Sequence, residues 1–271
     1  MDSTFNGLNR YNKITGLFQN HTANDTQADG LTHSSIWCIV KDNQGTLWLG
    51  TYFGGVNYFN PEYEIYTRYS YSSNEKKGLS NPVVGRTIED KDGNLWIGTE
   101  GGGLNYYNRR TREFKWYRPQ EGRNSISHNN VKALYYDADK EIIWIGTHLG
   151  GLNKLDIRSG HFTHYRMEEG NPNTLPSDII RDIIPYKSLL IIATQNGVCL
   201  FDPANGQCQQ LFKDSKEGKS IKMVADVTFD SEGTLWIAAT GEGVFSYRFD
   251  TCKLTNYRHD ATNRTASVIT M

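Results

Sequence analysis

The stretch "GNLWIGTEGGGLNYYN" at residues 93–108 is the first candidate for chemistry, because a run of glycines directly follows an apolar, strand-like segment. A glycine-rich loop in that position can cradle a phosphate group when the loop opens a helix. Here the loop opens a second aromatic, strand-like segment, and near copies stand at residues 45–60 and 141–156. A phosphate loop occurs once in a domain, so we expect these glycines to serve the fold.

Residues that could carry catalysis or a metal are scattered. The seven histidines do not cluster, the four cysteines show no CxxC spacing, and no serine, threonine or cysteine stands in a nucleophile elbow. We therefore expect no catalytic residue, no metal site and no cofactor, and His148 with Glu100 is the pair with which a test of catalysis would begin. Cys199 and Cys208 flank the turn "DPANG", where they form either a disulfide across a hairpin or, as is commoner, two buried thiols.

The composition indicates an all-β chain without a charged partner. The chain has 271 residues, 29 basic against 30 acidic side chains, 12% aromatic residues and 26 glycines. The balanced charge speaks against contact with nucleic acid, and the aromatics with frequent turns favour strands. No apolar run reaches the ~18 residues of a membrane helix, and no signal peptide is visible, so we expect this segment itself to make no membrane contact.

An internal repeat fixes the architecture. The anchors Trp48, Trp96, Trp144, Ile191 and Trp236 are separated by 48, 48, 47 and 45 residues. Each unit reads as four short strands with turns between them, which is typical of a propeller blade. The sequence thus predicts a single β-propeller region over residues 1–271.

Five complete blades with partial blades at both ends follow from this period. The predicted divisions are a partial blade at 1–30, blades at 31–78, 79–125, 126–174, 175–220 and 221–267, and the start of a further blade at 268–271. Either the ends complete a sixth, three-stranded blade, or the chain is part of a longer one; we favour the second, because propellers usually close by completing a blade from both termini.

Three units place an aspartate six residues before the tryptophan, at Asp42, Asp90 and Asp230. The spacing predicts a turn capped by the aspartate that leads into a buried tryptophan wedged between blades.

The unit D-x-x-G-x-[LI]-W-[IL]-G-T-x-x-G-G-[LV] resembles the two-component-regulator propeller repeat. "DNQGTLWLGTYFGGVNYFN", "DKDGNLWIGTEGGGLNYYN" and "WIGTHLGGLNKLD" match it closely, and the last two units match it loosely. The resemblance covers essentially the whole chain. It implies a seven-bladed propeller in the periplasmic sensor region of a hybrid two-component protein of a Bacteroides-like bacterium, anchored in the inner membrane.

The same resemblance implies what the parent protein does. Many members detect oligosaccharides released from glycans and signal to a histidine kinase, a phosphorelay receiver and a DNA-binding domain, none of which this chain contains. The resemblance therefore implies an oligosaccharide partner for this segment, and a homodimer is a further possible arrangement.

The ligand site is expected where residues depart from the repeat. The loops between the second and third strands carry variable side chains suited to stack on a sugar ring or to bind its hydroxyl groups. These are Tyr52, Phe53, Glu100, His148, Gln195, Asn196 and Glu242. The alternative is that they are ordinary solvated loop tips.

The first strands add Arg86, Lys132 and Arg181 at similar positions. These cations either grip an anionic group or pair with Glu89, Asp182 or Asp226, and we favour the pairing. Two other functions stay open: a propeller enzyme of the lyase, lactonase or glycosidase type, and a protein-interaction scaffold. The scaffold would use exposed outer-strand tyrosines, namely Tyr63, Tyr66, Tyr69 and Tyr71.

Overall fold

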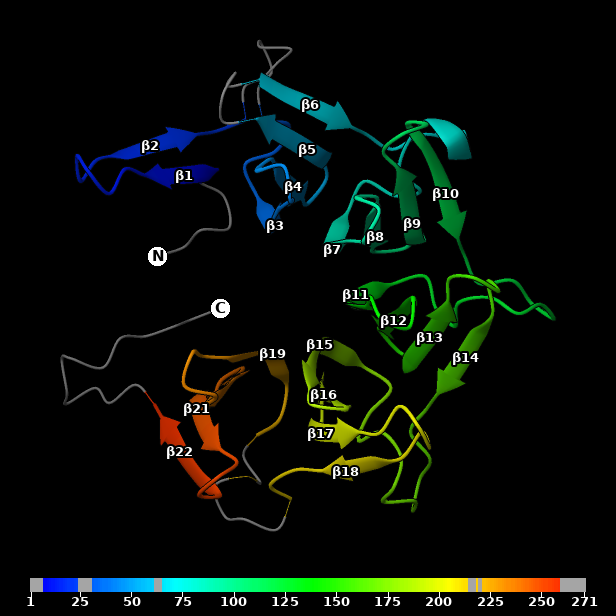
Figure 1. Cartoon of the computed structure of the whole chain (residues 1–271), viewed down its shortest axis with the longest axis vertical. Coiled ribbons are helices and arrows are strands. Elements are labelled where there is room, and N and C mark those ends of the chain that lie inside the picture. Colours follow the sequence, from blue (N-terminus) through cyan, green and yellow to red (C-terminus); the bar gives the residue numbers. More distant parts are fainter. Residues whose placement is uncertain (1–6, 24–30, 61–64, 214–217, 219–220, 259–271) are drawn as a thin grey trace. The chain divides into compact units, whose positions relative to one another are not determined.

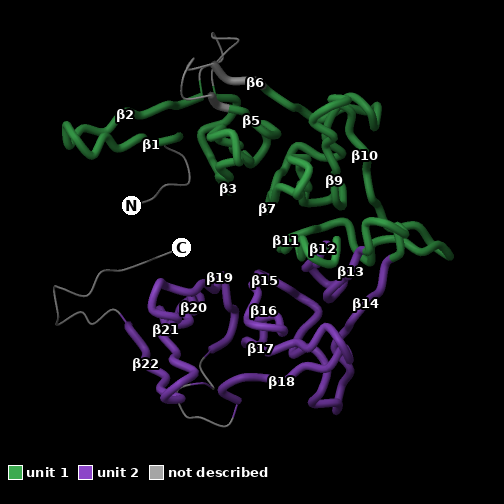
Figure 2. Tube along the Cα trace, viewed as in Figure 1, with its two compact units in different colours: residues 1–142, 156–161 green, residues 143–155, 162–271 purple. Residues whose placement is uncertain are grey.

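The computed structural model describes residues 7–23, 31–60, 65–213, 218 and 221–258. The start of a further blade at 268–271 and Tyr63 lie outside the described residues, as does the side chain of Tyr66. The chain divides into two compact units, shown in Figure 2: unit 1 holds residues 1–142 and 156–161, and unit 2 holds residues 143–155 and 162–271. Each unit is described by itself.

The described residues form one two-stranded and five four-stranded sheets (Figure 1). The two-stranded sheet pairs β1 with β2, and each four-stranded sheet joins its strands in chain order, β3 to β6 being the first. In unit 1 the strands are β1 (Leu8–Tyr11), β2 (Phe18–His21), β3 (Ile36–Lys41), β4 (Leu47–Thr51), β5 (Gly55–Asn60), β6 (Ile65–Tyr69), β7 (Val84–Glu89), β8 (Leu95–Thr99), β9 (Gly103–Asn108), β10 (Glu113–Tyr117) and β11 (Val131–Asp137).

The remaining strands are β12 (Ile142–Thr147), β13 (Leu152–Asp156), β14 (Phe162–Tyr165), β15 (Ile180–Tyr186), β16 (Leu189–Thr194), β17 (Gly197–Phe201), β18 (Cys208–Gln210), β19 (Val224–Phe229), β20 (Leu235–Ala239), β21 (Gly243–Arg248) and β22 (Lys253–Tyr257). A single turn of 3-10 helix, η1 (Glu75–Lys77), lies between β6 and β7, and none of the described residues forms a helix that could cross a membrane. The predicted all-β class is confirmed, whereas the blade boundaries and the blade number stay predictions.

The aspartates at the three predicted positions build the capped turn; the tryptophan that follows is buried at Trp48 and Trp96, as predicted, but only half-buried at Trp236. One oxygen of Asp42 accepts the backbone N–H groups of Gln44 and Thr46 at 2.9 and 2.8 Å, and the other accepts the indole N–H of Trp48 at 2.8 Å. Asp90 and Asp230 make the equivalent bonds. The turn thereby satisfies its backbone donors and fixes the ring that enters the core.

The glycines of the candidate phosphate loop are required by the turn between the second and third strands. Gly103 has φ +79°, a left-handed conformation that side chains rarely adopt, and a Cβ there would lie 2.3 Å from the carbonyl oxygen of Tyr117. Gly55 has φ +76° and meets the carbonyl oxygen of Tyr69 in the same way. The repeated glycine therefore allows two strands to approach closely.

In unit 1 the first two four-stranded sheets pack face to face through aromatic rings. Trp48 of β4 is 3% exposed and lies 6.2 Å from Tyr107 of β9, which in turn packs on Phe114 of β10. The hydroxyls of Tyr69 and Tyr107 are hydrogen-bonded at 2.8 Å. The interpretation of Tyr69 as an exposed interface residue is therefore wrong, because its ring is used to pack neighbouring sheets.

The β1–β2 hairpin of unit 1 carries an equivalent tyrosine–phenylalanine pair, but this pair is exposed. Tyr11 and Phe18 lie 4.8 Å apart at 39°, the same separation and angle as Tyr107 and Phe114. Yet Tyr11 and Phe18 are 51% and 70% exposed, whereas Tyr107 is 2% exposed. The hairpin thus reproduces the third and fourth strands of a blade, with its aromatic pair open.

The core of unit 2 joins its last two sheets around Ile191, Val224 and Phe245.

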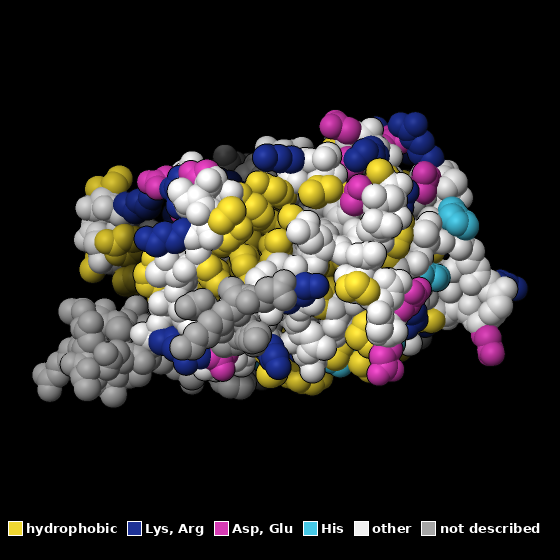
Figure 3. Space-filling view, turned by 90° about the horizontal axis from the view of Figure 1, so that it is seen from below, with side chains coloured by type: hydrophobic (Ala, Val, Ile, Leu, Met, Phe, Trp, Pro, Cys, Tyr) yellow, Lys and Arg dark blue, Asp and Glu magenta, His cyan; other side chains and the backbone are white. Residues whose placement is uncertain are grey.

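Figure 3 looks at the chain from the side on which β18 and β22 lie in Figure 1, and hydrophobic side chains gather on that face. Cys199 and Cys208 are buried free thiols with their sulfur atoms 3.4 Å apart, so they face each other across the hairpin without a disulfide bond.

Candidate functional site

Irregularities in the first strands direct particular side chains out of the sheets. The pairing of β3 with β4 shifts register between Ile36 and Cys38, which leaves Trp37 as the extra residue. The pairing of β15 with β16 shifts in the same way around Arg181, and β7 shifts around Gly85 and Arg86. Because such a bulge re-aims the side chain that it carries, Trp37 is 50% exposed although it belongs to an inner strand.

The residues directly after the second strands occupy equivalent positions. In three of the sheets this residue donates its backbone N–H to a carbonyl in the loop that leads into the first strand of the same sheet, at 3.0 to 3.1 Å. The pairs are Tyr52 with Ser35, Glu100 with Val83, and Gln195 with Ile179. The two loops of one sheet are thus joined, and the side chains that depart from the repeat are presented from fixed backbone.

Three aromatic residues of the first four-stranded sheet form an exposed cluster in unit 1. The rings of Trp37 and Tyr52 are stacked, with centroids 5.3 Å apart and an interplanar angle of 9°. Phe53 meets Tyr52 edge-on at 4.2 Å and is 58% exposed. We call Trp37, Tyr52 and Phe53 the aromatic platform.

A histidine of the adjoining loop supports this platform. The Nδ1 atom of His33 accepts the backbone N–H of Ser35 at 3.0 Å, as His128 does for Asn130 at 3.1 Å. The ring of His33 stands edge-on to Tyr52 at 6.5 Å. His33 and His128 therefore have a structural part in the turns before their strands.

An ion pair from the next two sheets lies beside the platform. Lys132 of β11 is hydrogen-bonded to the Glu100 carboxylate, and its Nζ atom is 5.8 Å from the centre of the Trp37 ring. The two charged side chains are 18% and 24% exposed. Unit 1 therefore brings together four predicted residues, Tyr52, Phe53, Glu100 and Lys132, around one unpredicted residue, Trp37.

The partners of the inner-strand cations differ from those expected. Lys132 pairs with Glu100, and the Glu89 carboxylate is instead 3.2 Å from the guanidinium of Arg109. Lys132 is thus paired, as we favoured, but its partner is the loop residue Glu100 and not one of the strand carboxylates that we had named. Arg86 also makes an interaction of its own.

The other predicted residues belong to unit 2, and their convergence with those of unit 1 stays a prediction. Asn196 donates its side-chain amide to the carbonyl of Pro176 at 3.3 Å, and Glu242 forms an ion pair with Arg258. His148 forms an isolated bridge with Ile179. Arg181 stands at the bulge of β15.

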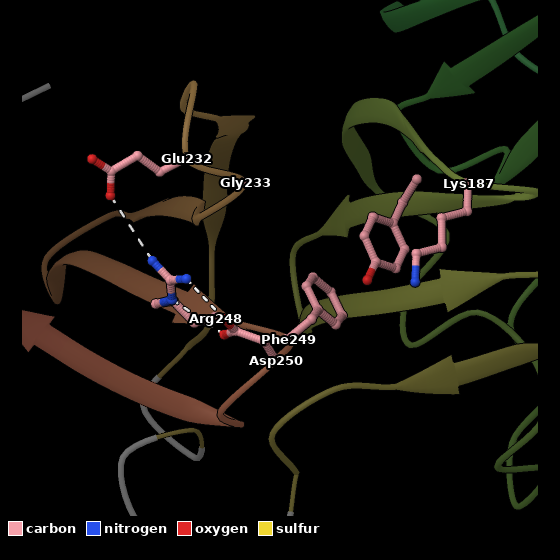
Figure 4. A pocket seen from close by; sticks show the side chains of 7 residues that line it. Lys187, Glu232, Gly233, Arg248, Phe249 and Asp250 are labelled. Carbon is pink, nitrogen blue, oxygen red and sulfur yellow. Dashed lines mark hydrogen bonds and ion pairs between the residues drawn. The ribbon is translucent and has the colours of Figure 1, made fainter.

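Unit 2 also contains an open cavity of about 410 Å³ between the turns of its last two sheets (Figure 4). Tyr186 and Phe249 are stacked there at 4.3 Å. Arg248 makes two hydrogen bonds to the Asp250 carboxylate, at 3.1 and 2.8 Å, and these lower the pKa of Asp250 to about 2. Because Arg248 is already paired with Asp250, its guanidinium is not a free binding group for an anionic ligand in this cavity.

Titratable groups elsewhere are perturbed by packing. The hydrogen bond that the Cys199 thiol donates to Cys208, together with burial, raises the pKa of Cys199 well above its ordinary value. Burial, followed by the Tyr107 hydroxyl, raises the pKa of Tyr69. Within the described ranges, no three histidine, cysteine or carboxylate groups come together in a way that could hold a metal ion.

Comparison with known proteins finds similarity to one repeat family and to several solved structures. The model of the two component regulator propeller matches residues 30–53, 78–101 and 125–148. No match was found among curated proteins. Among solved structures, the extracellular domain of the hybrid two component system BT3049 from B. thetaiotaomicron is similar over 81% of this chain and 29% of its own, with 25% identity and a TM-score of 0.68.

Two further structures share the fold. The extracellular domain of BT4673 from B. thetaiotaomicron is 21% identical over 94% of this chain and 41% of its own, with a TM-score of 0.64. An inactive virginiamycin B lyase from Staphylococcus aureus is 12% identical over 83% of this chain and 70% of its own, with a TM-score of 0.60. The chain spans less than half the length of the two B. thetaiotaomicron domains. It carries two component regulator propeller repeats at the three matched segments and has a β-propeller fold similar to that of the extracellular domain of the hybrid two component system BT3049.

Proposed function

We propose that this chain is an extracytoplasmic ligand-binding part of a two-component sensor, and that its ligand is an oligosaccharide. The family segments and the 25% identity to the BT3049 extracellular domain support the sensor role and a place outside the cytoplasm. We assign no kinase or transcriptional activity to these propeller repeats, and propose that both activities belong to the parent protein.

The observation that carries the proposal is the Trp37–Tyr52 stack. Half of the Trp37 surface is exposed, although the ring is held by its neighbour. A rigid aromatic face packs well on the C–H face of a sugar ring, and adjacent charged or amide groups bind the hydroxyls. Glu100 and Lys132 supply such groups beside the ring.

The enzyme alternative is kept open by the fold, which a lyase shares. Titration calorimetry of the purified chain against a panel of oligosaccharides, followed by chromatography of each mixture, separates the two functions. Saturable binding with the saccharide recovered intact supports the sensor. Cleavage of a titrated saccharide, or no binding across the panel, contradicts it.

A further inference from the structure

We propose that the aromatic platform and the Lys132–Glu100 pair form one binding site for a neutral oligosaccharide built of pyranose rings. This inference rests on the proposed function and narrows its ligand class. One pyranose ring would pack on the exposed part of Trp37, and its hydroxyl groups would bind to the ion pair, whose Lys132 Nζ lies 5.8 Å from the centre of the Trp37 ring.

The platform favours a six-membered ring. Trp37 is half exposed and is held nearly parallel to Tyr52, so its ring is a flat, fixed surface for a ligand. A pyranose chair with several axial C–H bonds on one side has a broad apolar face of matching shape. A puckered furanose presents less continuous apolar area, and stacking energy grows with the area that is buried.

The ion pair favours a neutral ligand. The Lys132 charge is neutralised by Glu100, and both side chains are largely shielded from water. An incoming carboxylate or sulfate would lie beside the Glu100 carboxylate, and like charges at a shielded site repel strongly. Arg86, a cation on another first strand of this unit, also makes an interaction of its own. Hydroxyl groups can instead accept from Lys132 and donate to Glu100 without separating the pair.

The local fold fixes both parts of the site. Trp37 comes from the bulge of β3, Tyr52 from the loop after β4, Glu100 from the loop after β8 and Lys132 from β11. The backbone bonds of Tyr52 and Glu100 to their neighbouring loops hold the side chains before a ligand arrives. A preformed site of this kind loses little conformational entropy on binding.

The first experiment compares three probes of similar size by titration calorimetry: cellotetraose, tetragalacturonic acid and a fructofuranosyl tetrasaccharide. We expect cellotetraose to bind most tightly, with an affinity that changes less than about twofold between ~50 and ~500 mM NaCl, because no net charge is neutralised. Tighter binding of tetragalacturonic acid, weakening with salt, or of the furanosyl probe would overturn the neutral-pyranose assignment and leave the proposed function standing. If none of the three probes binds, the assignment falls, and the wider saccharide panel decides the proposed function separately.

The second experiment tests the residues. Trp37→Ala should weaken cellotetraose binding about tenfold, which is near the upper limit of the affinity that one aromatic contact contributes. Trp37→Phe should restore part of the lost affinity. Phe18→Ala, which removes another exposed ring, that of the β1–β2 hairpin, is the control and should bind like the wild type. Unchanged affinity in Trp37→Ala, with saccharide binding intact in the wild type, would overturn the site alone.

A gain of binding provides the sharpest check on the ion pair. Glu100→Gln keeps the size and hydrogen-bonding ability of the side chain but releases the Lys132 charge. We expect this variant to bind tetragalacturonic acid at least about threefold more tightly than the wild type does, and to lose that gain at high salt. A variant that stays as indifferent to the acidic probe as the wild type contradicts the role assigned to the pair.

Discussion

The indole of Trp37 lies flat against the ring of Tyr52, 5.3 Å away and inclined by 9°, while half of its surface remains exposed. Two tryptophans of the repeat are used for packing instead: Trp96 and Trp144 are at most 2% exposed. One chain thus uses the same residue type as structural wedge and as open platform. The difference arises from the strand position, because Trp37 stands at a bulge and Trp96 within a regular ladder.

This contrast predicts opposite stability effects. Trp96→Ala should lower the free energy of unfolding by about 3–5 kcal/mol, since it leaves a cavity where a fully buried ring packs on Tyr106 and Tyr117. Trp37→Ala should change it by less than about 1 kcal/mol, because the ring is half exposed. Urea unfolding followed by circular dichroism measures both. A loss at Trp37 as large as that at Trp96 would show that Trp37 is a core residue.

The two identical aromatic pairs make a second matched test. Phe114 is buried and Phe18 exposed, although each meets its tyrosine at 4.8 Å and 39°. Phe114→Ala should therefore cost about 3–5 kcal/mol. Phe18→Ala should leave the melting temperature almost unchanged. Equal destabilisation by the two variants would mean that the β1–β2 hairpin is covered in solution.

The aspartate cap predicts a stability loss of a different origin. Asp42→Ala leaves the indole N–H of Trp48 and two backbone N–H groups without their acceptor, which should cost about 1–3 kcal/mol. Asp92→Ala changes an exposed aspartate in the neighbouring blade's turn and serves as the control. Chemical denaturation of the two variants should separate them clearly, and equal values would argue against the cap.

Two carboxylates predict how stability depends on pH. Arg248 lowers the pKa of Asp250 to about 2 from 3.8, and the Trp236 indole, with the Thr234 backbone, lowers that of Asp230. A pKa lowered by folding stabilises the protein above the unfolded value and ceases to do so as pH falls through the folded value. Stability should therefore decline between about pH 4 and 2, and less steeply in Asp250→Asn. Superimposable profiles for the wild type and Asp250→Asn would contradict this account.

Thiol chemistry gives a further readout of packing. Cys252 is exposed, whereas Cys199 and Cys208 are buried, and the raised pKa of Cys199 lowers its thiolate fraction. With Ellman's reagent at pH 8, Cys252 should react rapidly, and the buried pair should react after denaturation. Peptide mass spectrometry after brief alkylation identifies the modified residue. Early labelling of Cys199 or Cys208 would show that the β17–β18 hairpin opens readily.

Much of this architecture could be predicted from the sequence, because the repeat multiplies weak local signals. The position of Asp90 before Trp96 and the glycine at 103 each recur, so their structural roles could be assigned without a structure. The site was harder to predict. Glu100 and Tyr52 were found because they depart from the repeat, but Trp37 was missed, since an aromatic residue in an inner strand reads as core. Only the register shift of β3 reveals that its ring turns outward. The Lys132–Glu100 pair joins residues 32 positions apart, which spacing could not foresee.

The measurement that tests the central claim most directly follows the six tryptophan indole N–H signals by two-dimensional NMR during titration with a neutral oligosaccharide. The signals are assigned with single tryptophan variants. We expect the Trp37 signal to shift in a saturable manner, while those of the buried Trp96 and Trp144 stay in place. A Trp37 signal that remains unmoved at saturating saccharide would contradict the assignment of the Trp37–Tyr52 platform as the binding site.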